Sequence, residues 1–257
     1  MAISLKTLTA PSGQRPIIVT LVGEGGMGKT TLAASFPAPV IIRTEDGTAS
    51  LAGRDDVALF PMSRSSQDVL DALAALGTED HQFRTVIIDS VTQLNTLIES
   101  EIVASDPKAK SINQAMGGYG AGQSAVSERH RTVREWAGRL SEHKGMNVVF
   151  IAHADSETLE LPDADPYTRY TIRMHRKSVS HYSDNVDLVG FIKLKTFTTG
   201  SSDKKRAHTD GTRVITCYPT PSHISKNRFG IKEDLPFIEG ENPLARFIPA
   251  EPLAQAA

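Results

Sequence analysis

Short apolar runs alternate with helical apolar patterns along much of this chain. The runs are rich in β-branched residues and too short for helices, which is typical of buried strands. Between them, apolar residues recur at three- and four-residue spacing, which predicts amphipathic helices. The alternation predicts an α/β fold with a mostly parallel, twisted sheet flanked by helices. The expected strands are Ile17–Val22, Val40–Arg43, Val57–Phe60, Arg84–Ser90 and Val148–Ala152, and the expected helices are Gln67–Leu76, Val91–Ala104 and Ser124–His143.

The C-terminal part adds a β-hairpin and a change of composition. Two apolar strands, 188–197 and 212–220, flank a polar stretch and predict the hairpin. Residues 1–15 are expected to form a flexible arm. Past residue 240 the sequence becomes acidic and rich in Ala and Pro, so residues 241–257 are expected to be a flexible tail. The length suits one α/β domain, which we expect over residues 16–240.

The segment GEGGMGKTT follows the first expected strand and opens the first helix. It fits G-x-x-x-x-G-K-[ST], the pattern of a phosphate-binding P-loop. Glycines let backbone N–H groups curl around phosphate, and the helix N-terminus adds partial positive charge. Lys29 is expected to reach the β- and γ-phosphates, and the Thr30 hydroxyl to bind Mg²⁺. The predicted nucleotide-binding residues are Gly23, Glu24, Gly25, Gly26, Met27, Gly28, Lys29, Thr30 and Thr31.

Three polar residues lie at or just past the ends of expected strands, at the carboxyl ends where open α/β sheets gather functional groups. Glu45 follows the second strand and is expected to face the nucleotide, although carboxylates there also form turns. Asp89 ends an apolar strand in the manner of an acid that holds Mg²⁺ directly or through water. His153 can report on the γ-phosphate, or it can be a structural histidine bonded to a backbone carbonyl. We expect ATP and Mg²⁺ as cofactors, with Thr30 and Asp89 at the metal.

The net charge of −2 hides a strong asymmetry along the chain. Residues 169–232 contain 13 Lys and Arg against 4 Asp and Glu, or +9, whereas residues 1–168 contain 14 against 21, or −7. The basic region indicates a face that meets a polyanion, or a solvated basic face. No run of about 18 apolar residues is present, so no membrane span is expected. The single cysteine, Cys217, excludes an internal disulfide and indicates an intracellular, cytoplasmic location.

Two long segments are candidates for binding single-stranded DNA. The first, about residues 107–123, is glycine-rich and holds Lys108, Lys110 and Tyr119. A tyrosine in such a loop could stack on a base or pack on a neighbouring subunit. The second, about residues 154–177, starts as an acidic loop and ends basic and aromatic, the composition of single-strand binders. Its candidate residues are Arg169, Arg173, Arg176 and Lys177.

Lys226 and Arg228 lie two residues apart in the sequence KNRFG. In extended backbone both side chains project to the same side. Two cations placed together suit a phosphate group held by a neighbouring chain, or are simply two surface charges.

The order of these features resembles the RecA/RadA-type ATPase core over about residues 15–240. It is similar in particular to the phage-encoded, core-only RecA relatives of the Sak group, described as single-strand annealing proteins or minimal recombinases. The KNRFG sequence is identical to a motif of RadA-type branch-migration ATPases. The resemblance implies a RecA-like P-loop NTPase core in which Glu45 polarises the attacking water and His153 couples the γ-phosphate to DNA loops. It also implies that Lys226 and Arg228 reach the ATP site of the adjacent subunit.

The same resemblance implies an ATPase that DNA stimulates, assembled as a ring or filament with ATP between subunits. Single-stranded DNA is the expected partner, and a single-strand DNA-binding protein is a further candidate. The alternative is an ATPase coupled to a protein partner in phage DNA replication or packaging. ATPases of the ParA/MinD type are disfavoured because their signature lysine falls at Glu24 here. Switch ATPases of the NB-ARC type share GxGGMGKTTLA but are disfavoured, because they continue into winged-helix and repeat modules that are not expected here. A nucleotide kinase would need a lid with paired arginines, which is not evident.

Overall fold

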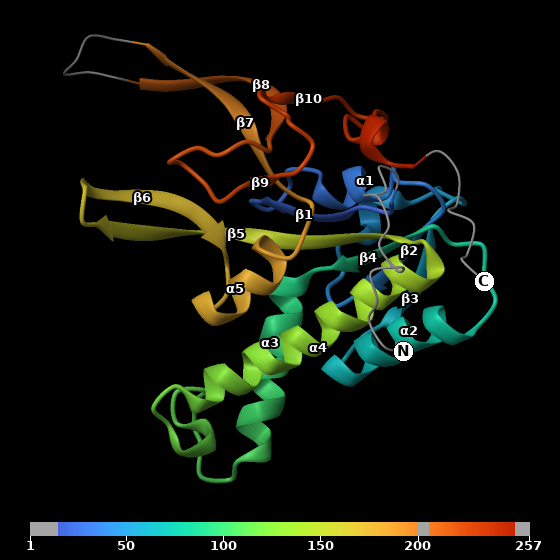
Figure 1. The fold of residues 1–257 in the computed structure, drawn as a ribbon, viewed down its shortest axis with the longest axis vertical. Helices are drawn as coiled ribbons and strands as arrows, with labels where there is room; N and C mark the ends of the chain where they lie inside the picture. The colour runs from blue at the N-terminus through green and yellow to red at the C-terminus, as the bar shows by residue number, and fades with distance from the viewer. Residues whose placement is uncertain (1–14, 200–205, 250–257) are drawn as a thin grey trace, which may run out of the picture.

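The computed structural model describes residues 15–199 and 206–249, and Figure 1 shows their arrangement. The strands are β1 (Ile18–Gly23), β2 (Pro39–Arg43), β3 (Ala58–Met62), β4 (Thr85–Asp89), β5 (Asn147–Leu161), β6 (Ala164–Ile172), β7 (Leu188–Thr199), β8 (Arg206–Thr216), β9 (Lys226–Asn227) and β10 (Leu235–Phe237). The α-helices are α1 (Lys29–Ala33), α2 (Ser66–Thr78), α3 (Val91–Ser105), α4 (Ala121–Lys144) and α5 (Arg176–Ser183). Short 3₁₀ turns are η2 (Thr48–Leu51), η3 (Ala115–Gly117) and η4 (Ala245–Phe247).

The strands form one sheet in the order β10-β8-β7-β1-β5-β4-β2-β3, with β6 paired to β5 and β9 to β7. The six strands from β7 to β3 in that order run parallel, and β6, β8, β9 and β10 pair antiparallel. This confirms the predicted α/β fold with its mostly parallel sheet, flanking helices and C-terminal hairpin. Because the central strands are parallel, their carboxyl ends meet at one edge of the sheet, where the P-loop follows β1.

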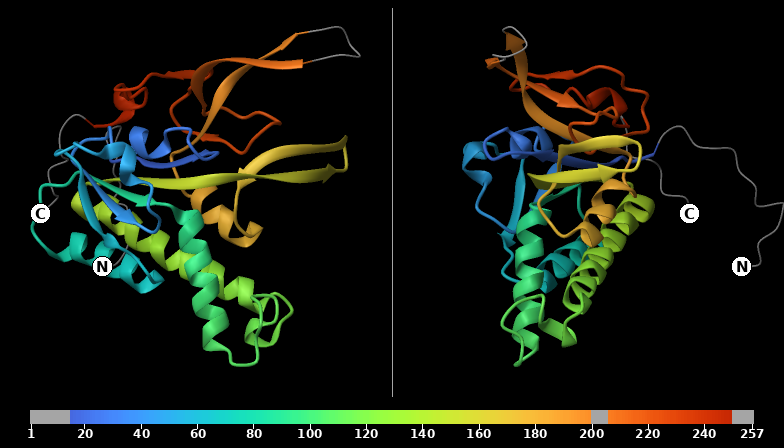
Figure 2. Two further views of the ribbon diagram at one scale, coloured as in Figure 1. Left: turned by 180° about the vertical axis from the view of Figure 1, so that it is seen from behind. Right: turned by 90° about the vertical axis from the view of Figure 1, so that its left-hand side faces the viewer.

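The sheet separates two apolar cores. Figure 2 shows the elements on either side of the sheet from two further directions. Alternate residues of β1 point to opposite faces, so Ile18 and Val22 join the core under α2, α3 and α4, whereas Val19 and Leu21 join the core beside α1. Both faces of β1 are covered, which explains why its sequence is an unbroken apolar run. The strand that leads into the P-loop is thereby held rigidly.

Two β-hairpins, β5–β6 and β7–β8, project from the same side of the sheet (Figure 1). From the sequence, β5 is expected to end at His153 and an acidic loop to follow it, and this prediction is wrong. The strand runs on to Leu161 and returns as β6. Cross-strand pairs on this polar ribbon, such as Arg169 Nε donating to Glu157 Oε1 at 2.8 Å, explain how an acidic stretch forms a strand.

The C-terminal residues 241–249 pack on the domain rather than forming the flexible tail that was expected from residue 241. Leu244 is buried in the core beside α1, and the rings of Phe247 and Phe229 stack with centroids 4.8 Å apart. Residues 250–257 of the expected tail and 1–14 of the expected arm lie outside the described residues. Within the described part, no helix is both long and apolar enough to cross a membrane.

Candidate nucleotide site

The P-loop connects β1 to α1, and its backbone conformation explains why two of its positions are glycine. Gly26 and Gly28 have φ of 75° and 86°, the left-handed region that glycine enters without steric cost. A Cβ on Gly28 would also lie 2.6 Å from a guanidinium nitrogen of Arg213 and 2.8 Å from the Phe237 ring. Backbone and neighbours both require glycine at this position, which leaves the loop free to approach a phosphate closely.

Lys29 lies almost buried at the start of α1. Its Nζ donates to the backbone oxygens of Gly23 at 2.9 Å and Glu24 at 2.7 Å, so the ammonium lies within the curl of the loop. Burial lowers the pKa of Lys29, and the nearby carboxylates of Asp89 and Glu45 act in the opposite direction. A cation is therefore held where the loop would bind phosphates.

The two predicted Mg²⁺ ligands meet in the same place. Thr30 Oγ1 donates to Asp89 Oδ2 at 2.7 Å. Burial raises the pKa of Asp89, while the hydrogen bond from Thr30 lowers it. A hydroxyl and a carboxylate oxygen suit a Mg²⁺ that accompanies a nucleotide. The surrounding cavity of about 520 Å³ is lined by the P-loop residues 26–31 and by Glu45, Asp46, Gly47, Ser50, Asp89, His153 and Arg213.

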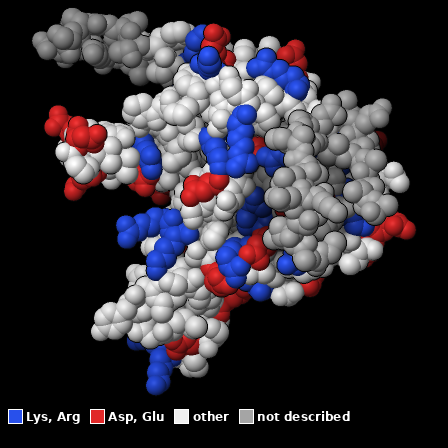
Figure 3. Space-filling model, in the orientation of Figure 1, with Lys and Arg blue, Asp and Glu red and all other residues white. Residues whose placement is uncertain are grey.

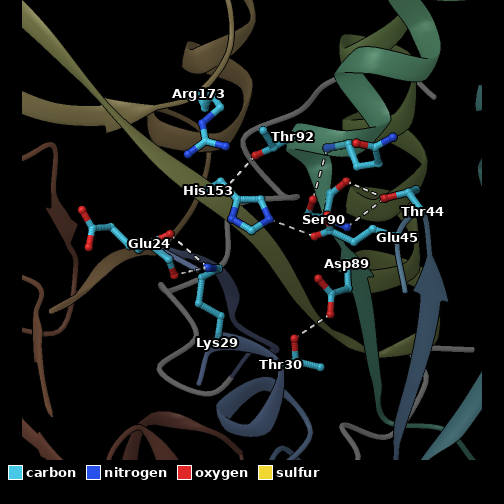
Figure 4. A network of polar contacts seen from close by, with 12 residues as sticks. Glu24, Lys29, Thr30, Thr44, Glu45, Asp89, Ser90, Thr92, His153 and Arg173 are labelled. Carbon is cyan, nitrogen blue, oxygen red and sulfur yellow. Dashed lines mark hydrogen bonds and ion pairs between the residues drawn. The ribbon is translucent and has the colours of Figure 1, made fainter. Parts of the chain in front are cut away.

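Glu45, in the bend just after β2, and His153 of β5 point toward each other at this cavity (Figure 4). His153 Nε2 and Glu45 Oε1 are 3.0 Å apart. This hydrogen bond is the main reason that the pKa of Glu45 lies below its usual value, and a hydrogen bond with Ser90 adds to it. Ser90 also caps α3 by accepting from Gln93 N at 3.1 Å. The structure therefore brings Lys29, Thr30, Glu45, Asp89 and His153 into one polar network.

The backbone at His153 is held by a hydrogen bond on each side of the residue. Its N–H donates to Thr92 Oγ1 at 2.9 Å, and its carbonyl accepts from Arg173 N at 2.9 Å. The Arg173 guanidinium donates to Ala154 O at 3.1 Å, and the side chain lies beside His153 in Figure 4. Arg173, expected on a DNA-binding loop, therefore lies next to the nucleotide cavity at the base of the β5–β6 hairpin.

Arg213 of β8 lines the same cavity, and it is not among the residues predicted from the sequence. Its guanidinium lies over the Phe237 ring, 4.6 Å from the centroid, and donates to Met27 O at 3.4 Å. No local motif surrounds it, because its place depends on the pairing of β8 with β10. Glu24 lies at the edge of the site: its backbone oxygen accepts from Lys29, whereas its side chain lines a separate cavity between the P-loop and β7.

Lys226 and Arg228 are not brought to the nucleotide cavity of their own chain. β9 pairs with the first residues of β7, at the end of the sheet opposite the P-loop. Lys226 Nζ donates to Asp184 O, and Arg228 NH1 donates to Asp187 Oδ1 at 2.9 Å. The buried Asp187 also accepts from Ile18 N at the start of β1. Any contact of these two cations with a nucleotide would therefore involve another subunit.

The remaining candidates for DNA binding lie in three places. Arg169 and Arg176 line a cavity of about 660 Å³ together with Lys226. Lys177 Nζ donates to Ser124 Oγ at 2.8 Å, and it would lie 3.8 Å from a Cβ on Gly120, so α5 meets the end of the glycine-rich loop. Lys108, Lys110 and the fully exposed Tyr119 lie beyond, in the connection between α3 and α4.

The fold and the site together define a P-loop ATPase. A protein-family comparison matches residues 15–229 to a family described as an AAA domain. The match covers most of the chain, which therefore belongs to this family. No curated protein matches the chain.

Proposed function

We propose that this protein is an ATP-dependent, single-stranded DNA-binding protein of phage-type homologous recombination that hydrolyses ATP between subunits. The observation that supports it best is the continuity of β5. This strand carries His153 at the nucleotide cavity and then leaves the sheet as one arm of the β5–β6 hairpin. A change at the γ-phosphate that moves His153 would be transmitted along the same strand to a surface that can meet DNA.

The cavity residues have distinct roles in this proposal. The P-loop N–H groups and Lys29 bind the phosphates, and Thr30 and Asp89 hold Mg²⁺, which would neutralise charge on the β- and γ-phosphates. Glu45 orients a water molecule for in-line attack, and His153 keeps the Glu45 carboxylate ionised and directed into the cavity. Lys226 and Arg228 of one subunit stabilise charge at the γ-phosphate bound by the next.

Replacing His153 by alanine should move the acid limb of the pH–rate profile to higher pH. The hydrogen bond from His153 lowers the pKa of Glu45, so without it the carboxylate takes up a proton at a higher pH and loses its role. His153→Gln keeps a donor for Glu45 and should leave the acid limb close to that of the parent protein. Steady-state ATP hydrolysis across pH measures this, and identical acid limbs for the three proteins would contradict the role assigned to His153.

The proposed DNA surface is supported by charge. Arg169, Arg176 and Lys226 line one cavity, and Lys and Arg side chains gather over the middle of the face shown in Figure 3. Arg169 is paired with Glu157, and acidic Asp184 lines the same cavity. Arg176 and Lys177 form no ion pair within the described part of the chain, which leaves their charges for phosphates.

Binding of a fluorescent oligothymidylate at several salt concentrations tests this surface. In the Arg176→Ala/Lys177→Ala protein we expect weaker binding and a slope of log K against log salt that is smaller by about 1.4, because each lost phosphate contact removes about 0.7 for single strands. Arg139→Ala/Lys144→Ala is the matched control, because it removes the same charge near the C-terminal end of α4, away from the contact of Lys177 with Ser124. It should change neither the affinity nor the slope. Equal slopes for both double variants would contradict this surface.

The alternative is an ATPase coupled to a protein partner in phage DNA replication or packaging. Its support is the acidic outer part of the β5–β6 hairpin, where Glu160, Asp163 and Asp165 are exposed and would repel DNA. Hydrolysis that single-stranded DNA leaves unchanged would favour this alternative.

A further inference from the structure

The Arg213 guanidinium lacks a charged partner among the described residues. It is half-buried and lines the cavity that holds the P-loop, Thr30 and Asp89. Among the described residues it forms no ion pair. Its hydrogen bond to Met27 O, at 3.4 Å, is longer than the roughly 2.7–3.2 Å that is usual for N–H···O hydrogen bonds. A guanidinium in such a place is ready to exchange a weak neutral acceptor for a charged one.

We propose that Arg213 binds the phosphate chain of the nucleotide held by its own subunit. The cavity is also lined by the carboxylates Glu45, Asp46 and Asp89, which would repel an anion, whereas the P-loop and Arg213 would attract it. A guanidinium forms short, charge-assisted and often bidentate hydrogen bonds with phosphate oxygens. The proposal rests on nucleotide binding at the P-loop, and it is independent of DNA.

Phe237 orients Arg213 and explains the choice of phosphate over base. The ring is buried, and the guanidinium covers it, so its face is not open to a nucleobase. Cation–π contact holds the guanidinium over the ring, and its N–H groups remain able to donate. The closeness of both groups to Gly28 places the donors against the phosphate-binding turn.

Binding of ligands with and without a base tests the proposal. Displacement of a fluorescent ADP analogue by Mg-ADP and by inorganic triphosphate gives both affinities without turnover. We expect Arg213→Met to weaken both ligands on the order of tenfold, since a charge-assisted hydrogen bond is lost. Arg246→Met is the matched control: Arg246 lies 4.7 Å over the Phe247 ring in the same manner but does not line this cavity, and both affinities should stay within about twofold.

Arg213→Gln provides a second variant in case Arg213→Met does not fold, because it keeps a planar polar group over Phe237 without charge. It should show the same loss for both ligands. Unchanged affinities in a folded variant would overturn the proposal, and so would a loss for ADP without a loss for inorganic triphosphate, which would indicate a role at the base. A Lys29→Ala protein that still binds ADP would instead count against the P-loop site itself.

Discussion

Replacing Lys29 by alanine should abolish nucleotide binding and the assembly that depends on it. Lys29 is the cation inside the P-loop curl, where its Nζ is held by two backbone oxygens. Its loss removes charge-assisted contacts to two phosphates, and we expect Kd for ATP to rise by about a hundredfold or more, equivalent to about 2.7 kcal/mol. Isothermal titration measures the affinity, and light scattering with and without nucleotide measures assembly.

We expect the Lys29→Ala protein to fold. Burial lowers the pKa of this lysine, which means that the folded protein pays a desolvation cost for the charge and alanine removes that cost. Lys232→Ala, which removes an exposed lysine, is the control and should bind and assemble as the parent protein does. A Lys29→Ala protein that assembles with ATP at the normal concentration would show that the P-loop is not the site that drives assembly.

Arg228→Ala should lose most ATP turnover while the affinity of a single subunit for ATP stays nearly unchanged. Arg228 lies at the end of the sheet opposite its own P-loop, so any catalytic contact has to be made with a neighbour. Arginines supplied in trans to a γ-phosphate accelerate hydrolysis by about 10³-fold or more, and a loss on the order of 10³ in kcat is expected. A large loss of affinity in the monomer would argue against this role.

Arg228 also neutralises the buried Asp187, so a structural effect has to be separated from a catalytic one. Arg15 pairs with the same carboxylate, and Arg15→Ala should lower the melting temperature without a comparable loss of turnover. Mixing the subunits of two inactive variants provides a sharper control. Arg228→Ala subunits keep an intact site and Glu45→Gln subunits keep the arginine, so mixed assemblies should regain activity that neither variant has alone. No recovery in assemblies shown to be mixed would contradict action in trans.

The sequence predicts most of the elements because each carries a local signal. β1 and β4 are covered on both faces and read as unbroken apolar runs. The P-loop has a defined spacing. Glu45 follows β2, Asp89 ends β4 and His153 lies in β5 beside the end of β1, and these strands run parallel. Once the sheet is known to be parallel, the meeting of these three side chains at one edge follows from topology.

The features that were missed have no such signal. The outer β5–β6 ribbon is mostly polar and exposed, and the alternation of Leu159 and Leu161 with polar residues in β5 is too short to distinguish a strand from a loop. It is stabilised by cross-strand pairs such as Glu157 with Arg169, twelve residues apart. Arg213 likewise reaches the P-loop only through the register of β8 with β10. The spacing of Lys226 and Arg228 indicated that they act together, but only the structure shows the backbone oxygen of Asp184 and the carboxylate of Asp187 that bind them.

ATP hydrolysis with and without single-stranded DNA, at about 50 and about 200 mM salt, tests most directly whether this ATPase is coupled to DNA. We predict clear stimulation by oligothymidylate at the lower salt concentration and much less at the higher one, because phosphate contacts release counterions on binding. A protein that hydrolyses ATP at the same rate with and without DNA at low salt would contradict the proposal. The basic residues Arg176 and Lys177 would then belong to a solvated face.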